Sequence, residues 1–416
     1  MLFEERRSDA FRRTHPFLRG RFRSLPPSTS FRVSPEGPRP EYAYLCRPGA
    51  TIVTGNSAEF LFDGEAVLPS ILEAVREARR SIVVEMYHFA ADFIGRAFAR
   101  ALAERASAGV HVRVLVDAAG SRHTPRAFFG WMRERGVRVQ SVNPIRKFLL
   151  HGSIFRWRDH RKLVLIDGAT AIVGGANLSR DYAPVRAGGG GWRDAAIRVT
   201  GPIVDALSAS FEKQWKETAS AAHRAAPAEP AAPAGEVPMT VLESHPLGPG
   251  PFASVFRHAV NQARRRIWIA NPYFLPPRSF RKALRRAARR GVDVRILVPR
   301  RSYLPFVLRA SQRSYARFLR SGIRLFEWPG TMMHSKAAVI DGLWSTIGSY
   351  NIDPLSLLVN RELNVVLLGR ASGIRFEEMF ATDFDRAEEI DDAAWKRRGT
   401  WRRITENLCS AFRILL

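Results

Sequence analysis

Two stretches of the chain, His160-Arg-Lys-Leu-Val-Leu-Ile-Asp167 and His334-Ser-Lys-Ala-Ala-Val-Ile-Asp341, share one pattern of residue types. Each is followed by two small residues and an asparagine, as Gly174-Gly-Ala-Asn177 in the first copy and Gly348-Ser-Tyr-Asn351 in the second. Every member of the second copy lies 174 positions after its counterpart. A pattern repeated once at this distance indicates a chain of two related halves.

The segments before these stretches also correspond between the halves. The same elements are predicted twice, in the same order: buried strands at 81–89 and 266–274, amphipathic helices at about 94–108 and 278–290, and strands at 109–117 and 291–299. Strands alternating with helices favour parallel pairing with helices on both faces. We therefore predict an α/β fold of two tandem α-β-α sandwich repeats with mixed, largely parallel sheets, related by a pseudo-twofold axis, with the active site at their interface.

Composition divides the 416 residues into four parts. We predict a basic N-terminal arm at 1–45, a first repeat at 46–217, an Ala/Pro-rich linker at 218–239 and a second repeat at 240–416. For the arm, a solvated tail and a membrane-binding segment both stay open. Neither a signal peptide nor an apolar run long enough to cross a bilayer is found in the sequence, so we expect any membrane contact to be peripheral. The net charge of +26 favours polyanionic partners: nucleic acid, an acidic membrane or a phosphate-bearing substrate.

The histidines and lysines of the two copies suit the chemistry of a phosphodiester. Residues two apart on a strand face the same way, so each copy presents an imidazole beside an ammonium group. One histidine can attack phosphorus while the other protonates the leaving alcohol, and cationic and amide groups stabilise the phosphate oxygens. The candidate catalytic histidines are His160 and His334. The candidate phosphate-binding residues are Lys162, Lys336, Asn177, Asn351 and Ser349, and both lysines also count as catalytic candidates.

Four carboxylates complete the candidate catalytic set. Asp194 and Glu362 lie at comparable places downstream of the two copies, where each can orient an imidazole. Asp167 and Asp341 are included because they end the repeated stretch, although a structural role at a turn is favoured for both. Glu85 either lines the cleft or is a buried structural residue. Because no His, Cys and carboxylate cluster has ligand spacing, we expect no metal and no cofactor.

These residues resemble the paired His-Lys-Asp signature of the phospholipase D superfamily, and the chain is most similar to bacterial cardiolipin synthases. The similarity spans roughly residues 50–370 and includes Trp192-Arg-Asp194, Asn360-Arg-Glu362 and Ile269-Ala-Asn-Pro-Tyr-Phe-Leu-Pro-Pro277. The membrane-spanning N-terminal helices of longer synthases are missing, so the chain resembles the short, peripheral form. Many relatives carry an aspartate near position 303, where this chain has Tyr303.

The resemblance implies a ping-pong reaction at the two histidines. His160 would attack a first phosphatidylglycerol, forming a phosphatidyl-histidine and releasing glycerol, and His334 would act as general acid and base. A second phosphatidylglycerol would then yield cardiolipin. The family also implies a peripheral position on an anionic phospholipid membrane, at the cytoplasmic face of the bacterial inner membrane, with no obligate protein partner.

Three other functions stay open at this stage. A phospholipase D hydrolase or a nuclease of the same superfamily would use the same motif, because the motif recognises a phosphodiester and not its substituents. Nucleic acid is disfavoured as a partner, since the sequence contains no recognisable RNA-binding module. A non-catalytic scaffold that binds phospholipid or nucleic acid is the alternative outside the enzymes.

Overall fold

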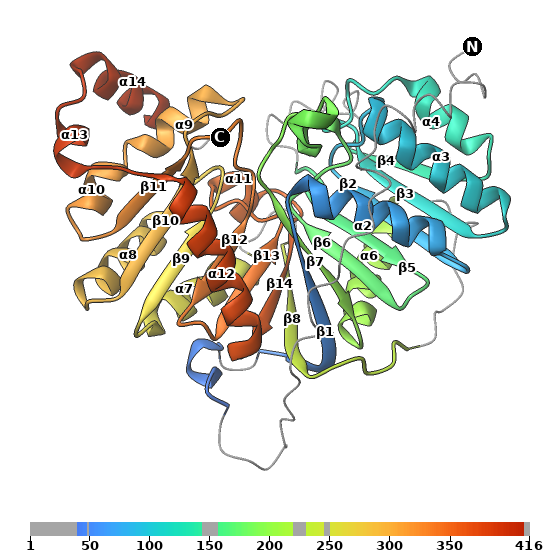
Figure 1. Ribbon diagram of the computed structural model, residues 1–416, viewed down its shortest axis with the longest axis horizontal. Coiled ribbons are helices and arrows are strands. Elements are labelled where there is room, and N and C mark those ends of the chain that lie inside the picture. The colour runs from blue at the N-terminus through green and yellow to red at the C-terminus, as the bar shows by residue number, and fades with distance from the viewer. Residues whose placement is uncertain (1–39, 48–49, 144–156, 219–229, 245–249, 412–416) are drawn as a thin grey trace.

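The computed structural model describes residues 40–47, 50–143, 157–218, 230–244 and 250–411. Most of the predicted basic arm (1–39) and half of the predicted linker (219–229) lie outside the described residues. Within them, all the strands form one continuous sheet across the molecule, with one half of the chain on each side of its centre (Figure 1).

The two halves contain the same series of elements. The first half, after a short helix η3 (Ala43–Leu45), consists of β1 (Val53–Phe62), α2 (Asp63–Glu77), β2 (Ser81–Met86), α3 (Phe93–Ser107), β3 (His111–Asp117), α4 (Arg126–Arg133), β4 (Arg138–Val142), β5 (Lys162–Ile166), β6 (Thr170–Gly174), η4 (Arg180–Tyr182), η5 (Val185–Ala187), β7 (Ala195–Thr200) and α6 (Ile203–Thr218). The second half consists of β8 (Val237–Glu243), α7 (Pro251–Gln262), β9 (Arg266–Ala270), α8 (Arg278–Arg289), β10 (Asp293–Pro299), α9 (Pro305–Gln312), α10 (Tyr315–Leu319), β11 (Arg324–Trp328), β12 (Ala337–Ile340), β13 (Trp344–Gly348), α11 (Pro354–Leu358), β14 (Leu363–Leu368), α12 (Arg370–Arg386), β15 (Glu388–Glu389), α13 (Asp392–Lys396) and α14 (Thr400–Ala411).

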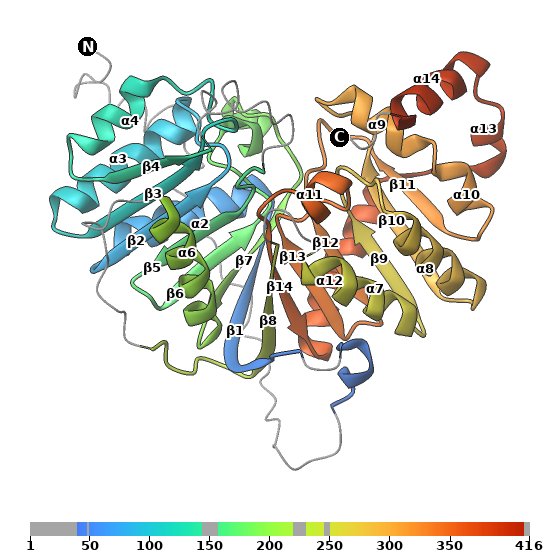
Figure 2. The ribbon, with the colours of Figure 1, turned by 180° about the vertical axis from the view of Figure 1, so that it is seen from behind.

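The order of strands reflects the duplication. Across the sheet they run β15-β11-β10-β9-β12-β13-β14-β8-β1-β7-β6-β5-β2-β3-β4, so the series outward from β8 matches the series outward from β1. Helices α2, α3 and α12 cover the face seen in Figure 1, whereas α6, α7 and α8 cover the face seen in Figure 2. Equivalent helices therefore lie on opposite faces, as a pseudo-twofold axis in the plane of the sheet requires.

The prediction of a mixed sheet is confirmed, but the prediction of largely parallel pairing is wrong. Among the described strands, ten neighbouring pairs are antiparallel and four are parallel. Parallel pairs occur only where a helix crosses over, as between β2 and β3, while hairpins join the strands that carry the motif. The two predicted sheets are also joined into one, because β1 pairs with β8.

Local sequence patterns predicted the positions of two helices correctly. The predicted helices at 94–108 and 278–290 correspond to α3 and α8. Each is followed by a glycine with positive φ, Gly109 at 89° and Gly291 at 90°, a conformation that costs other residues free energy and that ends a helix. The start of β8 at Val237 puts the last residues of the predicted linker inside the sheet. None of the helices in the described ranges is long and apolar enough to cross a bilayer.

Candidate active site

Each histidine segment is clamped by backbone of the other half. His160 lies two residues before β5 and His334 three residues before β12, so both histidines precede the strands on which the sequence analysis placed them. The N–H of His160 donates to the carbonyl of Arg361 (2.9 Å), and the N–H of His334 donates to the carbonyl of Arg193 (2.7 Å). These two hydrogen bonds fix both segments at the boundary between the halves.

The carboxylates next to those clamps orient the imidazoles. Nδ1 of His160 lies 3.0 Å from Oε2 of Glu362, and Nδ1 of His334 lies 3.1 Å from Oδ2 of Asp194. Each carboxylate comes from the half opposite its histidine, and both carboxylates are fully buried. Ser356 holds Glu362 in turn, because its hydroxyl donates to Oε1 at 2.6 Å. A partner at Nδ1 fixes the ring and leaves Nε2 to face a substrate.

The surroundings of the two Nδ1 atoms differ. Glu362 is the one hydrogen-bond partner of Nδ1 of His160 in the described part of the chain. Nδ1 of His334 also has the Tyr182 hydroxyl at 3.1 Å and Nζ of Lys336 at 2.8 Å. A ring nitrogen cannot donate to a carboxylate and accept from an ammonium group at once. The position of the ring proton is therefore better defined in His160 than in His334.

Both lysines lie beside the histidine of their own copy. Nζ of Lys162 donates to the His160 carbonyl at 2.6 Å, and Nζ of Lys336 donates to the His334 carbonyl. Both side chains are almost wholly buried, and Nζ of Lys162 lies 5.2 Å from the centre of the Tyr87 ring. Two ammonium groups and two imidazoles therefore share one buried site, a suitable environment for a phosphate.

Burial dominates the acid-base properties of this group. Removal from water lowers the pKa of Lys162 to about 7, against the opposing charge of Glu362. It lowers the pKa of Lys336 to about 8, against the opposing charge of Asp194. Burial likewise lowers the pKa of His160.

The pKa of His334 is lowered further, well below its ordinary value. Burial is the largest cause, followed by the charges of Lys336, Lys162 and His160. Both histidines lie at the boundary between the halves, because backbone of each half clamps the histidine segment of the other. In the absence of a bound anion, the lowered pKa of each ring favours its neutral form.

Small residues next to β6 make room for a carboxylate. A Cβ atom on Gly175 would lie 2.4 Å from Oδ1 of Asp194, so a larger residue there would displace the group that orients His334. The small residue at position 175 therefore allows the close approach of Asp194.

The predicted phosphate-binding residues that follow β6 and β13 differ in their contacts. Asn177 accepts from the N–H of His88 (3.1 Å) and donates to the Tyr182 hydroxyl (3.0 Å). Ser349 accepts from the N–H of Leu363, so its contacts hold β14. Asn351 is buried, and its Oδ1 has no partner among the described residues. The amide of Asn351 is therefore the one with hydrogen-bonding capacity to spare.

The inclusion of Asp167 and Asp341 in the catalytic set is corrected by their contacts. The carboxylate of Asp167 accepts N–H groups from residues 79–81, and that of Asp341 accepts N–H groups from residues 264–266. Each lies five residues after the lysine of its motif, about 17 Å from it at 3.3 Å per residue of strand. They fix turns, as the favoured structural role predicted.

Glu85, left open between two roles, is a buried structural residue. It forms an ion pair of 2.5 Å with Arg161, and neither side chain reaches solvent appreciably. Burial raises the pKa of Glu85, although the charge of Arg161 opposes that effect. Glu85 therefore anchors the strand next to the motif and does not line the cleft.

Aromatic residues surround both imidazoles, and the sequence analysis missed Tyr87 and Tyr182 among them. Tyr87 packs edge-on against His160, with ring centroids 4.9 Å apart, and Tyr182 and Trp192 pack against His334 at 5.7 and 5.5 Å. Tyr303 stacks on Trp192 at 5.3 Å, so the residue that departs from the family lies at the site. Of the two missed residues, Tyr87 had a usable signal, because it lies near the end of a predicted buried strand and such ends commonly form sites. No group of acidic, His or Cys residues within the described segments is arranged to hold a metal ion.

Comparison with known proteins identifies the family of this site. The family model described as "Cardiolipin synthase, PLD-like domain" matches residues 71–215 and 256–386, one segment in each half. Cardiolipin synthase A of Pseudomonas entomophila is 33% identical over 81% of this chain and 70% of its own length. A probable cardiolipin synthase of Bacillus subtilis is 31% identical over 87% of this chain and 72% of its own length.

Solved structures support the fold. The phosphatidylserine synthase of Haemophilus influenzae superposes with a TM-score of 0.68 over 86% of this chain and 95% of that one, at 14% sequence identity. The polyphosphate kinase of Porphyromonas gingivalis gives a TM-score of 0.54 over 81% of this chain and 49% of its own, at 15% identity. At such identities the likeness concerns the fold alone.

Proposed function

The chain belongs to the family of cardiolipin synthases with phospholipase D-like domains, and from that premise we propose that it is a phosphatidyltransferase working through a phosphohistidine. The proposed reaction converts two molecules of phosphatidylglycerol into cardiolipin and glycerol. One observation carries it: two buried histidine-lysine pairs share a site, and each imidazole is held by a carboxylate of the opposite half.

In the first step, Nε2 of His160 attacks phosphorus and the bond from phosphorus to the glycerol oxygen breaks. His334 gives that oxygen its proton, and glycerol leaves. The Nδ1 contact of His160 with Glu362 supports this assignment, because a proton on Nδ1 leaves the Nε2 lone pair free. Lys162 and Lys336 neutralise the charge on the phosphate oxygens.

In the second step, the terminal hydroxyl of another phosphatidylglycerol attacks the phosphohistidine. His334 removes the proton of that hydroxyl, and the bond from phosphorus to His160 breaks. The substrate phosphate counteracts the lysine charges that lower the pKa of His334, so the ring can carry a proton when substrate is bound. Asn177, whose NH2 group lies beside the Tyr182 hydroxyl, and Asn351 are proposed to position the phosphate by donating hydrogen bonds from their side-chain NH2 groups.

Exposed apolar side chains around the site support contact with a membrane. Tyr303, Leu304 and Phe306 lie at the start of α9 and are 40–56% exposed, and Leu358 on α11 is 52% exposed. Tyr303 stacks on Trp192, which packs against His334, so these side chains border the site. We call these four residues the apolar rim. Apolar anchors of this kind favour the interface of a bilayer. The proposed location is peripheral, on anionic phospholipid at the cytoplasmic face of the bacterial inner membrane.

A product assay tests the proposal. Protein incubated with phosphatidylglycerol vesicles in EDTA is expected to release glycerol and form cardiolipin in equal amounts. Phosphatidic acid in place of cardiolipin would indicate a hydrolase. Nicking of supercoiled plasmid without lipid turnover would indicate a nuclease, and neither activity would indicate a scaffold. Strong inhibition by EDTA, reversed by added metal, would contradict the metal-free mechanism.

A further inference from the structure

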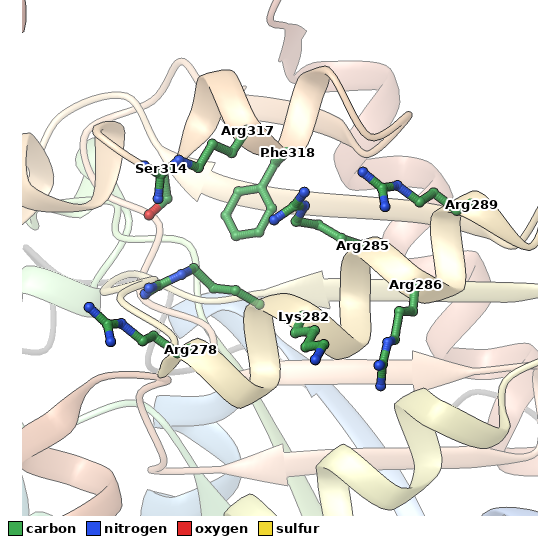
Figure 3. Close-up of a pocket in the computed structure, with 9 residues that line it drawn as sticks. Arg278, Lys282, Arg285, Arg286, Arg289, Ser314, Arg317 and Phe318 are labelled. Atoms are coloured by element: carbon green, nitrogen blue, oxygen red, sulfur yellow. The ribbon is translucent and has the colours of Figure 1, made fainter.

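A cationic groove lies on the outer helices of the second half, apart from the active site. Its volume is about 380 Å³. Seven basic side chains line it together with Ser314 and Phe318: Arg278, Arg281, Lys282, Arg285, Arg286, Arg289 and Arg317. Figure 3 shows the basic groups spread along α8, with Arg285 reaching toward Phe318 beside α10. We call this surface the cationic groove.

The basic residues of α8 follow the period of a helix. They recur every three or four positions from Arg278 to Arg289, which puts them in a row about 17 Å long at 1.5 Å per residue. No acidic residue interrupts α8. Like charges three or four positions apart destabilise a helix, so this row does not serve the stability of α8.

The duplication provides an internal comparison. Helix α3 occupies the equivalent place in the first half, yet it carries only Arg96, Arg100 and Arg105 together with Glu104. Since α3 packs on its half of the sheet without a continuous basic row, the fold does not require one. The row on α8 therefore calls for an explanation outside folding.

Three charges of the cationic groove are uncompensated in the part of the chain that the structure describes: Lys282, Arg286 and Arg289 have no carboxylate within ion-pair distance. Arginine and lysine in such a concave array suit phosphate groups. Phe318, at the floor of the groove, is only 1% exposed and cannot stack with a base, the contact on which single-strand binding relies.

We propose that the cationic groove binds the headgroup phosphates of anionic phospholipid, as an attachment site separate from the catalytic site. The choice of lipid over other polyanions rests on the proposed function. The position of the groove agrees with it. Arg278 lies three residues after Leu275, which packs with Val307 of α9 in a cluster that includes Tyr273, and Tyr273 packs against Tyr303 of the apolar rim. The groove and the rim are therefore neighbouring parts of one membrane-facing region.

Vesicle flotation with the full chain tests this proposal. The groove variant neutralises three exposed cations of α8: Lys282→Gln, Arg286→Gln and Arg289→Gln. The control variant removes the same total charge from the equivalent helix: Arg96→Gln, Arg100→Gln and Arg105→Gln. Both are compared with the unaltered protein on vesicles of phosphatidylcholine containing phosphatidylglycerol, after thermal denaturation has verified that they are folded.

The groove variant is expected to lose roughly 100-fold in partition coefficient, because each cation near an anionic surface contributes about a five-fold factor. The control variant is expected to lose less than about five-fold, and the difference should shrink in high salt. Equal losses in the two variants would overturn the proposal, since they would show that vesicle binding depends on the net charge of the protein and not on the groove. A groove variant that loses plasmid binding but not vesicle binding would also overturn it.

Two further measurements separate this proposal from the proposed function. Excess vesicles that contain phosphatidylglycerol should compete for the protein. Inorganic phosphate at constant ionic strength should not displace the protein from vesicles. Displacement at millimolar phosphate would overturn the lipid assignment. Turnover of a water-soluble, short-chain phosphatidylglycerol should be unchanged in the groove variant. Absence of turnover in every form of the protein would defeat the proposed function, whereas the flotation result would still decide the role of the groove.

Discussion

At each imidazole a single carboxylate decides which ring nitrogen faces the substrate. Glu362 is the one hydrogen-bond partner of Nδ1 of His160 among the described residues, whereas Nδ1 of His334 is shared by Asp194, Tyr182 and Lys336. This asymmetry between two copies of one motif is the physical basis for assigning them different roles.

Replacement of each histidine tests that assignment. His160→Ala and His334→Ala are each expected to lower turnover by at least about 1,000-fold, within the range for loss of a nucleophile or general acid. Only His334→Ala should form a phosphatidyl adduct, because it alone keeps the nucleophile. The adduct should form slowly, since the general acid is missing, and persist, since the base that activates the acceptor is missing too. Intact-protein mass spectrometry at alkaline pH detects the adduct. An adduct on His160→Ala would reverse the two roles.

The lysines predict how activity depends on pH. The pKa values of Lys162 and Lys336 are lowered to about 7 and about 8, so kcat/KM should fall as the pH rises through this range and the phosphate-binding charge is lost. The alkaline limb of the pH profile of kcat should lie at higher pH than that of kcat/KM, because a bound phosphate favours the charged lysines. The acid limb should lie below pH 6.5, since the pKa of His160 is lowered from 6.5.

Rates measured on a soluble, short-chain phosphatidylglycerol between pH 5 and 10 are sufficient for this test. A kcat/KM that stays constant from about pH 7 to 9.5 would contradict the role of the lysines. So would identical upper limbs for kcat and kcat/KM.

At the scale of elements, the hairpin that ends each motif strand is a structural device. Asp167 has a φ of 55° and accepts three backbone N–H groups from the turn before β2. Burial opposes ionisation, but these donors and the charge of Arg80 lower the pKa of Asp167. Its contribution to stability is therefore full above its unfolded pKa of roughly 4 and is lost as the pH falls through the lowered folded value.

Asp167→Ala is expected to lower the free energy of unfolding by about 2 kcal/mol at neutral pH, because backbone donors lose a charged acceptor. The variant should keep kcat within about two-fold, since the carboxylate lies far from the imidazoles. Denaturant unfolding and steady-state kinetics on the same preparation measure both quantities. A large loss of kcat in a protein of normal stability would restore Asp167 to the catalytic set.

At the scale of the whole molecule, the site exists only because each half supplies residues that hold the histidine of the other half. The backbone of residues 193 and 361 clamps the histidine segment of the opposite half, and the next residue of each supplies the orienting carboxylate. One chain therefore contains one complete site, built by both halves.

Mixing two inactive full-length variants tests whether that site is intramolecular. Purified His160→Ala and His334→Ala proteins are expected to remain inactive together, since no chain then contains both histidines on one phosphate. The measurement is cardiolipin formation by the mixture, with the unaltered protein diluted to the same site concentration as control. Recovery of about a quarter of the normal rate would indicate that chains exchange halves.

The sequence by itself determined the duplication, the two histidine-lysine pairs and the strand-helix-strand order that precedes the motif in each half. These follow from local spacing: the side-chain period of a strand, apolar faces of helices, and glycines that end α3 and α8. The family resemblance followed from the same residues and was confirmed by the comparisons. Identical spacing in both copies made the site recognisable before any coordinates.

Only the tertiary structure decided which carboxylate serves which histidine, that the strands are mostly antiparallel, and where Tyr182, Trp192 and Tyr303 lie. The physical reason is that these contacts join residues 140 or more positions apart, or loops without a periodic pattern. Sequence spacing constrains neighbours along one strand or helix. Pairing between the halves depends on the sheet that brings β1 beside β8, and no local pattern encodes it.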